Sequence, residues 1–176
     1  MKTIEEHLIG YAASHRDRRN IATHFVGVPM IVFAAILALQ MVWIPLGPVA
    51  VTLAAVLSLA ACLYYLRLDW AFGLTMAVVL FAMCAAASEI APRWSEGGTL
   101  ALAAAIFTAG WALQFLGHRY EGVKPAFFDD AMQLAIGPLF VCAEAFFLLG
   151  AKAELRRRVE ERVGPTVARR ERGVRA

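Results

Sequence analysis

This sequence contains a long stretch without any charged residue. No charged residue occurs between Phe25 and Arg67, and this gap is long enough for two membrane-spanning helices of about 20 residues each. The hydrophobic fraction of 60% and the mean hydropathy of +0.62 are too apolar for a typical soluble protein of this size. These features exclude an ordinary soluble domain, and we predict an integral membrane protein.

Cysteine is scarce as well. The chain has three cysteines, and all of them lie inside apolar segments without a Cys-x-x-Cys spacing. We therefore expect small buried side chains, and neither a disulfide nor a thiolate metal site. The three residues are Cys62, Cys84 and Cys142.

The beginning of the chain lacks the features of a secretory signal. Its first 20 residues have no basic start, apolar centre and small-residue cleavage site, so we expect the first spanning helix to be an uncleaved anchor. The net charge of +3 comes largely from Lys and Arg near the two ends. This distribution predicts contact with membrane lipid head groups, and no nucleic acid as a partner.

The apolar segments predict an all-α fold, an integral membrane bundle of four spanning helices. The expected spans are residues 25–42, 46–66, 71–91 and 99–116. A short amphipathic helix over residues 3–14 precedes them. Uncharged and polar turns are expected over residues 43–48 and 92–98, because Pro and Gly gather there.

A fifth apolar segment, residues 127–150, is harder to place. Lys and Arg are concentrated near both ends of the chain, so the positive-inside rule puts both termini in the cytoplasm. Four spans satisfy this rule, whereas a fifth would send the basic tail outside. We therefore expect this segment to break near Gly137-Pro138 and re-enter, or to lie buried against the bundle. Asp129 and Asp130 are expected to cap its start.

These expectations define two parts of the chain. Residues 1–151 are predicted to form a membrane-embedded catalytic domain, and residues 152–176 a basic cytoplasmic tail that is a solvated, fraying helix. The predicted location is a bacterial inner membrane, or the endoplasmic reticulum if the source is eukaryotic. A homo-oligomer is compatible with the sequence.

Three histidines lie at the polar edges of the apolar segments. His15 and His24 precede the first span, and His118 follows the fourth. Four spans bring all three to one membrane surface, on the cytoplasmic side. Neutral imidazole is the commonest protein ligand for Zn, Fe, Cu and Ni, so we predict that these residues bind one metal ion. The alternative is that they are polar residues near lipid head groups, since His-x8-His is not a standard zinc motif.

Sharing one ion requires a turn in the chain between His15 and His24. On one continuous helix, nine residues would rotate the two side chains about 180° apart. The charged stretch at residues 16–19 can supply the break, with Asn20 as the N-cap of the following helix.

Other polar side chains are expected to support these histidines. Tyr11 and Asn20 each stand one helical turn before a histidine and could orient its ring. Gln114 shares the helix face of His118 and is expected to find a partner in the bundle. Glu144 lies in an apolar run, where a carboxylate is costly, so it has either a functional role or a structural hydrogen bond.

Glu121 is the carboxylate nearest to His118 in sequence, on the same helix face. It could bind the metal, hold the His118 ring or act as a catalytic base. It could also pair with Arg119 or Lys124 as an ordinary surface residue.

Three polar motifs together show a resemblance to a known family. They are Tyr11-x3-His15-x4-Asn20-x3-His24-x4-Pro29, Gly117-His118-x2-Glu121-x3-Pro125-Ala126 and Pro138-x-Phe140-x3-Glu144. The combination resembles the membrane-bound 2-hydroxy fatty acid dioxygenases, whose yeast member acts in phytosphingosine breakdown. The resemblance extends from residue 11 to about residue 147, and the middle spans match only as apolar helices.

The resemblance implies an Fe(2+)-dependent α-oxidation. A 2-hydroxy fatty acid reacts with molecular oxygen and loses its first carbon, giving the acid one carbon shorter. The required histidines of the family match His15, His24 and His118. The carboxylate of the substrate would be steered by cations near the site, and the candidates are Arg16, Arg18, Arg19, Arg119 and Lys124.

Two other classes of function stay open from the residues alone. A zinc-dependent membrane lipid hydrolase would use the same three histidines, with Glu121 as its base. A small membrane transporter or scaffold would explain the Gly/Pro-interrupted segment and Glu144. The identity of a bound metal separates these classes: iron favours the oxygenase, zinc the hydrolase, and no metal the scaffold.

Overall fold

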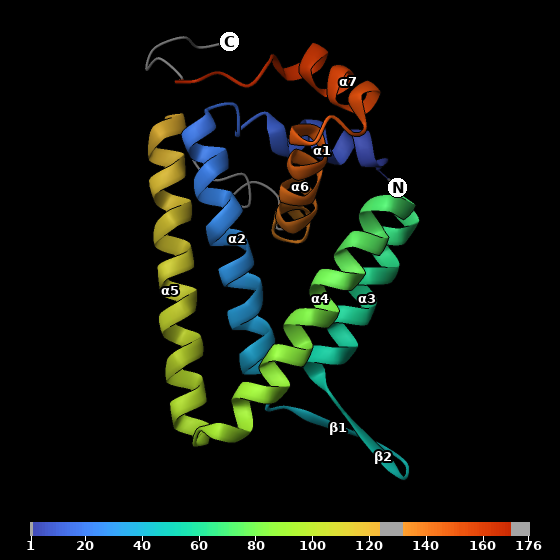
Figure 1. The fold of residues 1–176 in the computed structure, drawn as a ribbon, viewed down its shortest axis with the longest axis vertical. Helices are drawn as coiled ribbons and strands as arrows, with labels where there is room; N and C mark the ends of the chain where they lie inside the picture. Colours follow the sequence, from blue (N-terminus) through green and yellow to red (C-terminus); the bar gives the residue numbers. More distant parts are fainter. Residues whose placement is uncertain (1, 124–131, 170–176) are drawn as a thin grey trace. The chain divides into compact units, whose positions relative to one another are not determined.

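The computed structural model describes residues 2–123 and 132–169, which are almost entirely helical. The helices are α1 (Ile4–Ala12), α2 (Arg18–Leu39), α3 (Leu53–Leu68), α4 (Trp70–Ile90), α5 (Glu96–Glu121), α6 (Met132–Leu148) and α7 (Ala153–Val163). A hairpin of β1 (Trp43–Leu46) and β2 (Val49–Thr52) precedes α3, and a 3-10 turn, η1 (Ala91–Arg93), follows α4. Figure 1 shows the order of these elements.

The chain forms two compact units. Unit 1 contains Met1–Val28 and Trp111–Ala176, and unit 2 contains Pro29–Gly110. Both α2 and α5 pass from one unit into the other. The histidines singled out from the sequence all belong to unit 1.

In the described part of the chain, three helices are long and apolar enough to cross a membrane, namely α2, α4 with its extension to Arg93, and α5. If α6 and α7, which form a bent pair, are counted together as one span, the number rises to four. The second predicted span is shorter than expected, because α3 has 16 residues, or roughly 24 Å against a bilayer core of about 30 Å. The residues before Leu53 form the hairpin instead of the first turns of this helix.

The hairpin was predicted only as a turn. Gly47 has a φ of 64° and begins a two-residue loop between Leu46 and Val49, which pair across the strands. Gly in the first central position followed by Pro48 suits a type II′ turn, whose twist matches that of paired strands. Thr52 then caps α3 by accepting a hydrogen bond from the backbone N–H of Ala55.

Unit 2 contains the helical hairpin of α3 and α4. Asp69 separates the two helices and caps α4, because its carboxylate accepts hydrogen bonds from the backbone N–H groups of Ala71 and Phe72. Gly73 lets the helices approach closely, since a Cβ at this position would overlap the backbone of Leu66.

In unit 1 the chain turns sharply between α1 and α2. Thr3 and Glu6 form a capping box at the start of α1, and α2 begins at Arg18. The break therefore falls at residues 13–17, close to the predicted position. The prediction that Asn20 is the N-cap is wrong: Asn20 lies inside α2, and the carboxylate of Asp17 accepts the N–H of Arg19.

The break predicted at Gly137-Pro138 is also wrong. The helix α6 continues through both residues. The chain bends by 114° between α6 and α7, where Gly150 and Lys152 adopt the positive φ values of 77° and 56°. The other expectation for this segment, that it lies buried against neighbouring helices, is supported, because one face of α6 is buried and the helix packs on α1. The start of the predicted segment, with Asp129 and Asp130, lies outside the described residues.

The sequence predicted a helix solvated on all sides over this part of the tail, but α7 has a buried face. Leu155 and Val159 are buried, the helix packs on α1, and Arg158 pairs with Glu5 of α1 at 3.1 Å. Beyond α7, the backbone of Val167 lies beside the turn between α1 and α2. The tail up to Val167 thus belongs to the packed structure of unit 1, and its last seven residues lie outside the described part.

Candidate metal centre

His15, His24 and His118 lie together in unit 1. Each offers one ring nitrogen, and these nitrogens are all within 4.8 Å of one another. The three side chains are buried, with exposed fractions of 1%, 1% and 6%. In the part of the chain that is described, this is the group of metal-ligating side chains that satisfies the distances of a shared ion.

The turn between α1 and α2 explains how residues nine apart can meet. His15 lies just after α1, and the chain reverses before α2 carries His24 to the same point. The Nε2 atoms of the two rings are 3.1 Å apart. His118 comes from the last turn of α5, and its ring centroid lies 4.8 Å from that of His15 and 5.3 Å from that of His24.

A glycine allows α5 to approach α2 at this level. A Cβ at Gly117 would overlap the side-chain oxygens of Thr23 and Asn20. The residue before His118 must therefore lack a side chain for α5 to come this close to α2.

Backbone carbonyl groups determine the tautomers of two histidines. The Nδ1 atom of His15 is 2.7 Å from the carbonyl oxygen of Tyr11, and that of His24 is 2.9 Å from the carbonyl oxygen of Asn20. Carbonyl oxygens only accept hydrogen bonds, so each Nδ1 carries the proton. Both Nε2 atoms are then left with a lone pair.

These two lone pairs face each other. Two neutral Nε2 atoms 3.1 Å apart repel unless a cation lies between them. Ligands that bind one ion at about 2.1 Å, at 90–110° to each other, are separated by roughly 3.0–3.4 Å. Donation of the other ring N–H to a carbonyl oxygen is also the usual arrangement of metal-binding histidines. The residues present therefore fit a metal ion.

Burial keeps His15 neutral. Loss of solvent, followed by the charges of His24 and His118, lowers the pKa of His15 well below its ordinary value. The ring stacks on Tyr11, with centroids 4.2 Å apart and an interplanar angle of 16°, and burial raises the pKa of the Tyr11 phenol. An uncharged imidazole with a free Nε2 is the form that binds a metal.

The contacts of Glu121 are with the turn that carries His15. Its two oxygens accept the backbone N–H of Arg16 at 3.0 and 3.1 Å, and one accepts the N–H of Asp17 at 2.8 Å. The amide of Asn20 donates to the same oxygen at 3.1 Å. These contacts give Glu121 a positioning role, and its predicted catalytic role stays a prediction.

Tyr11 and Asn20 contact the rings of His15 and His24 through their backbone carbonyl groups, and their predicted role in orienting these rings stays a prediction. The Asn20 side chain instead joins Glu121 to the carbonyl oxygen of Ser14. Gln114 is buried one helical turn before His118, and its Nε2 has no hydrogen-bond partner among the described residues. The Nδ1 atom of His118 likewise has none there.

Arg16 is the residue whose position the sequence did not reveal. Its guanidinium is buried, donates to the carbonyl oxygens of Ala12 and His15, and pairs with Glu144 at 3.4 Å. It also donates to the carbonyl oxygen of Gly164, beyond α7. Sequence reasoning treated Arg16 as one of several cations that could steer the substrate carboxylate. Its burial could not be predicted, because it depends on α6 and on the tail.

The cations predicted to bind substrate have different surroundings. Arg19 pairs with Asp17 at 2.6 Å and lies over the ring of Tyr120. Arg119 is exposed, and Lys124 lies outside the described residues. Their role in substrate binding stays a prediction.

Comparisons with known proteins agree with the motifs. The family model described as "2-hydroxy-palmitic acid dioxygenase Mpo1-like" matches residues 1–149. The chain is similar to the 2-hydroxy-palmitic acid dioxygenase MPO1 of Saccharomyces cerevisiae, with 31% identity over 152 residues, or 85% of this chain and 83% of the yeast protein. No solved structure matches the chain. The chain thus belongs to the Mpo1-like 2-hydroxy-palmitic acid dioxygenase family.

Proposed function

We propose that this protein is an Fe(2+)-dependent membrane dioxygenase that converts a 2-hydroxy fatty acid and molecular oxygen to the fatty acid one carbon shorter. The observation that carries the proposal is the buried pair of facing Nε2 atoms of His15 and His24, with His118 beside them. Family membership supports the class of substrate and reaction.

The residues of the site hold and orient the metal. His15, His24 and His118 would be its ligands, and an iron ion bound there would supply the redox chemistry with oxygen. The carbonyl groups of Tyr11 and Asn20 hold two rings in the tautomer that leaves Nε2 available.

The overall reaction balances without a second organic substrate. One 2-hydroxy acid and one oxygen molecule give the shorter acid, carbon dioxide and water. The carbon that bears the hydroxyl loses three electrons and the carboxyl carbon loses one, so the oxygen molecule accepts all four. The chain then has to bind one lipid, one ion and oxygen.

We assign binding of the substrate carboxylate to cations that are close in sequence to the three histidines. Arg19 is already engaged by Asp17. Arg119 is exposed and has no carboxylate partner in the described part of the chain, so it suits a bidentate contact with a carboxylate. Lys124 follows closely in sequence and is proposed to assist.

The zinc hydrolase is the weaker alternative. Its proposed base, Glu121, has both oxygens engaged by backbone N–H groups of the turn at Arg16 and Asp17. A carboxylate held in this way is poorly placed to take a proton from a metal-bound water.

Activity with defined metals tests the proposal. The protein is purified without oxygen, loaded with iron or with zinc, and given 2-hydroxypalmitate and oxygen. We expect pentadecanoic acid only from the iron form. His7→Gln is the matched control for His118→Ala, because His7 is a buried histidine outside the cluster. Equal activity of the zinc form, or an active His118→Ala protein, would contradict the proposal.

We also propose that the site faces the cytoplasm, with both termini on that side of a bacterial inner membrane or of the endoplasmic reticulum. The support is the excess of Lys and Arg at the two ends. A reporter fused to the C-terminus tests this orientation, and an external signal from it would refute the proposal.

A further inference from the structure

A cavity of about 360 Å³ lies in unit 1, lined by residues of α2, α6, α7 and the segment after α7. The residues of α2 that line it are Arg18, Ile21, Ala22 and Phe25. The other lining residues are Glu144, Phe147, Leu148, Arg156 and Thr166. Two of these, Arg156 and Thr166, follow the stretch matched by the family model, so the cavity is partly made by the tail of this chain.

The polar groups of the cavity favour an anion. Arg18 is exposed and has no carboxylate partner among residues 2–123 and 132–169. Arg156 pairs with Glu160 at 2.8 Å and retains further N–H donors on its guanidinium. The negative charge of Glu144 is balanced by Arg16 at 3.4 Å.

The other walls are apolar. Ile21 and Phe25 stand on α2, and Phe147 and Leu148 stand on α6. Arg18 and Phe25 are seven residues apart on one helix, or roughly 10 Å along its axis. A ligand with a charged head at Arg18 would therefore extend a hydrocarbon chain past Phe25, along a helix that is apolar enough to cross a membrane.

The size of the cavity selects between amphiphiles. Ligand cavities commonly measure roughly 300–1,000 Å³, and this one is near the lower limit. It suits the head and first carbons of one chain better than the glycerol backbone and two chains of a phospholipid.

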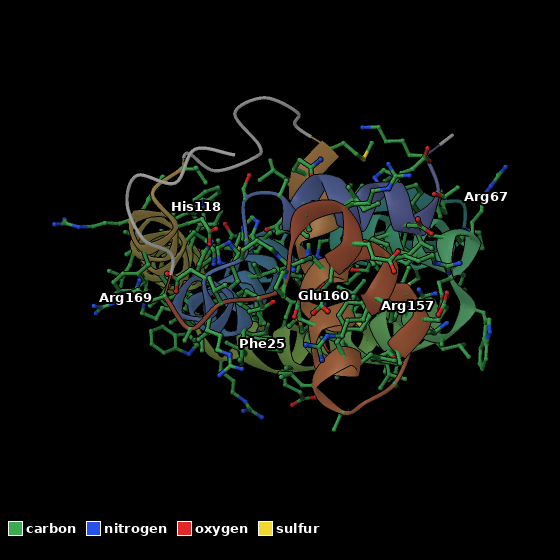
Figure 2. The ribbon with its side chains drawn as sticks, turned by 90° about the horizontal axis from the view of Figure 1, so that it is seen from above. Phe25, Arg67, His118, Arg157, Glu160 and Arg169 are labelled. Carbon is green, nitrogen blue, oxygen red and sulfur yellow. The ribbon has the colours of Figure 1, made fainter. Side chains whose placement is uncertain are left out.

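The cavity is separate from the histidine cluster. Its four residues on α2 centre roughly 110° around the helix from His24, because each residue turns the helix by about 100°. In the view from above, His118 and Phe25 are labelled on different sides of the α2 ribbon (Figure 2). A molecule bound along Phe25 would thus lie on another face of α2 from the metal-binding nitrogens.

We propose that this cavity binds the carboxylate end of a long-chain fatty acid, at a site distinct from the histidine cluster. Arg18 and Arg156 bind the carboxylate, and the apolar walls cover the first part of the chain. The choice of a fatty acid among single-chain anions rests on the proposed function, which consumes and releases such acids. The site would hold a fatty acid beside the reacting centre.

Photochemical labelling tests the proposal. Full-length protein without iron, in a neutral detergent, is incubated with palmitate that carries a diazirine near its carboxyl end. Palmitate lacks the 2-hydroxyl group of the proposed substrate, so it is not converted during the experiment. We expect labels on the first two turns of α2 and the last turns of α6. Unlabelled palmitate should compete, and hexadecanol, with the same chain and no charge, should not.

Three variants sharpen this test. Arg18→Gln should weaken palmitate binding by about tenfold, as expected for one charge-assisted hydrogen bond. Ala22→Phe should abolish labelling without changing charge, because Ala22 is an exposed wall residue. Arg157→Gln is the control: Arg157 is the next residue on α7, pairs with Glu154 and Glu161, and does not line the cavity.

Several outcomes would overturn the proposal. These are labels on the peptide that contains His118, equal competition by phosphatidylglycerol, or equal binding by Arg18→Gln and Arg157→Gln. The two proposals fail separately. If labelling depends on Arg18 but the protein shows no dioxygenase turnover, the fatty-acid site is supported and the proposed function is refuted. If the protein turns over its substrate but is not labelled, the proposed function is supported and the fatty-acid site is refuted.

Discussion

The two units of this protein differ in what they bury. Among residues 2–123 and 132–169, 13 polar or charged side chains are buried, and all but Thr52 and Thr99 belong to unit 1. Unit 2 contains the hairpin of α3 and α4, where large apolar side chains such as Leu59, Val78 and Phe81 are exposed. Unit 2 thus has the surface of a membrane anchor, whereas unit 1 uses costly polar burial to hold three imidazoles.

The difference teaches where substitutions should matter. In unit 2 the hydrogen bonds of polar side chains are mostly to neighbours in sequence, such as those of Asp69 with Ala71 and Phe72, so the effect of losing one is local. In unit 1 the polar groups bind one another, so removing one leaves a buried partner unsatisfied. The same kind of substitution should therefore cost much more in unit 1.

Removal of a proposed ligand should have the largest effect. His24→Ala deletes one of the two facing Nε2 atoms, and we expect loss of stoichiometric iron and at least about a hundredfold loss of turnover. Ser58→Ala is the control in unit 2, where the Ser58 hydroxyl contacts Cys84. Iron content and product formation are measured for both proteins. Equal iron content would show that the units do not differ as described.

Adding one methyl group should have different effects at the two ends of α5. Gly117→Ala places a Cβ against Thr23 and Asn20, whereas a Cβ at Gly97 meets nothing within 4 Å. We expect Gly117→Ala to cost about 1–3 kcal/mol of unfolding free energy and to weaken iron binding. Gly97→Ala should leave both unchanged. Thermal unfolding and an iron titration check the pair, and similar behaviour of the two variants would contradict close packing at Gly117.

Loss of one carboxylate charge should also distinguish the units. Glu121→Gln removes a charged acceptor from the N–H groups of Arg16 and Asp17, so we expect iron affinity to fall by about 10–100-fold. Glu89→Gln breaks an exposed ion pair with Arg93 in unit 2 and should change stability by less than about 0.5 kcal/mol. If Glu121 were the catalytic base, turnover would fall while iron affinity stayed the same.

Truncation of the tail should have the smallest effect. Ending the chain after Val163 removes the backbone hydrogen bonds of Val167 with Arg16 and Arg18, at 2.8 and 2.9 Å. The truncation also removes the carbonyl oxygen of Gly164, which accepts a hydrogen bond from the Arg16 guanidinium. We expect a several-fold loss of iron affinity, since three hydrogen bonds near His15 are lost. Ending the chain after Arg169 keeps these bonds and is the control. Equal iron affinity of the two truncated proteins would mean that the tail does not stabilise the site.

Helix positions could be predicted because they depend on local patterns, and the clustered histidines because the order of the apolar spans and the family resemblance both pointed to His15, His24 and His118. The charge-free stretches located the apolar helices, and the polar stretch at residues 16–19 located the turn that brings His15 to His24. The short α3 was missed because the type II′ turn at Gly47-Pro48 extends an apolar segment as strands, which hydropathy alone does not distinguish from a helix.

The rest depended on contacts between distant parts of the chain. The role of Glu121 as an acceptor for the turn at Arg16 follows from the approach of α5 to α2, which no local pattern contains. The break near Gly137-Pro138 was expected because a fifth span would have placed the basic tail outside, but α6 continues through both residues and packs on α1. Burial of Arg16 depends on Glu144 and on the tail.

The central claim is that three imidazoles bind one iron ion. X-ray absorption at the iron edge, on protein loaded with one equivalent of Fe(2+) without oxygen, tests it most directly. The account predicts a spectrum with scattering from three imidazole rings in the native protein, and from two or none in His118→Ala. A native spectrum without imidazole scattering, or one unchanged in His118→Ala, would contradict it.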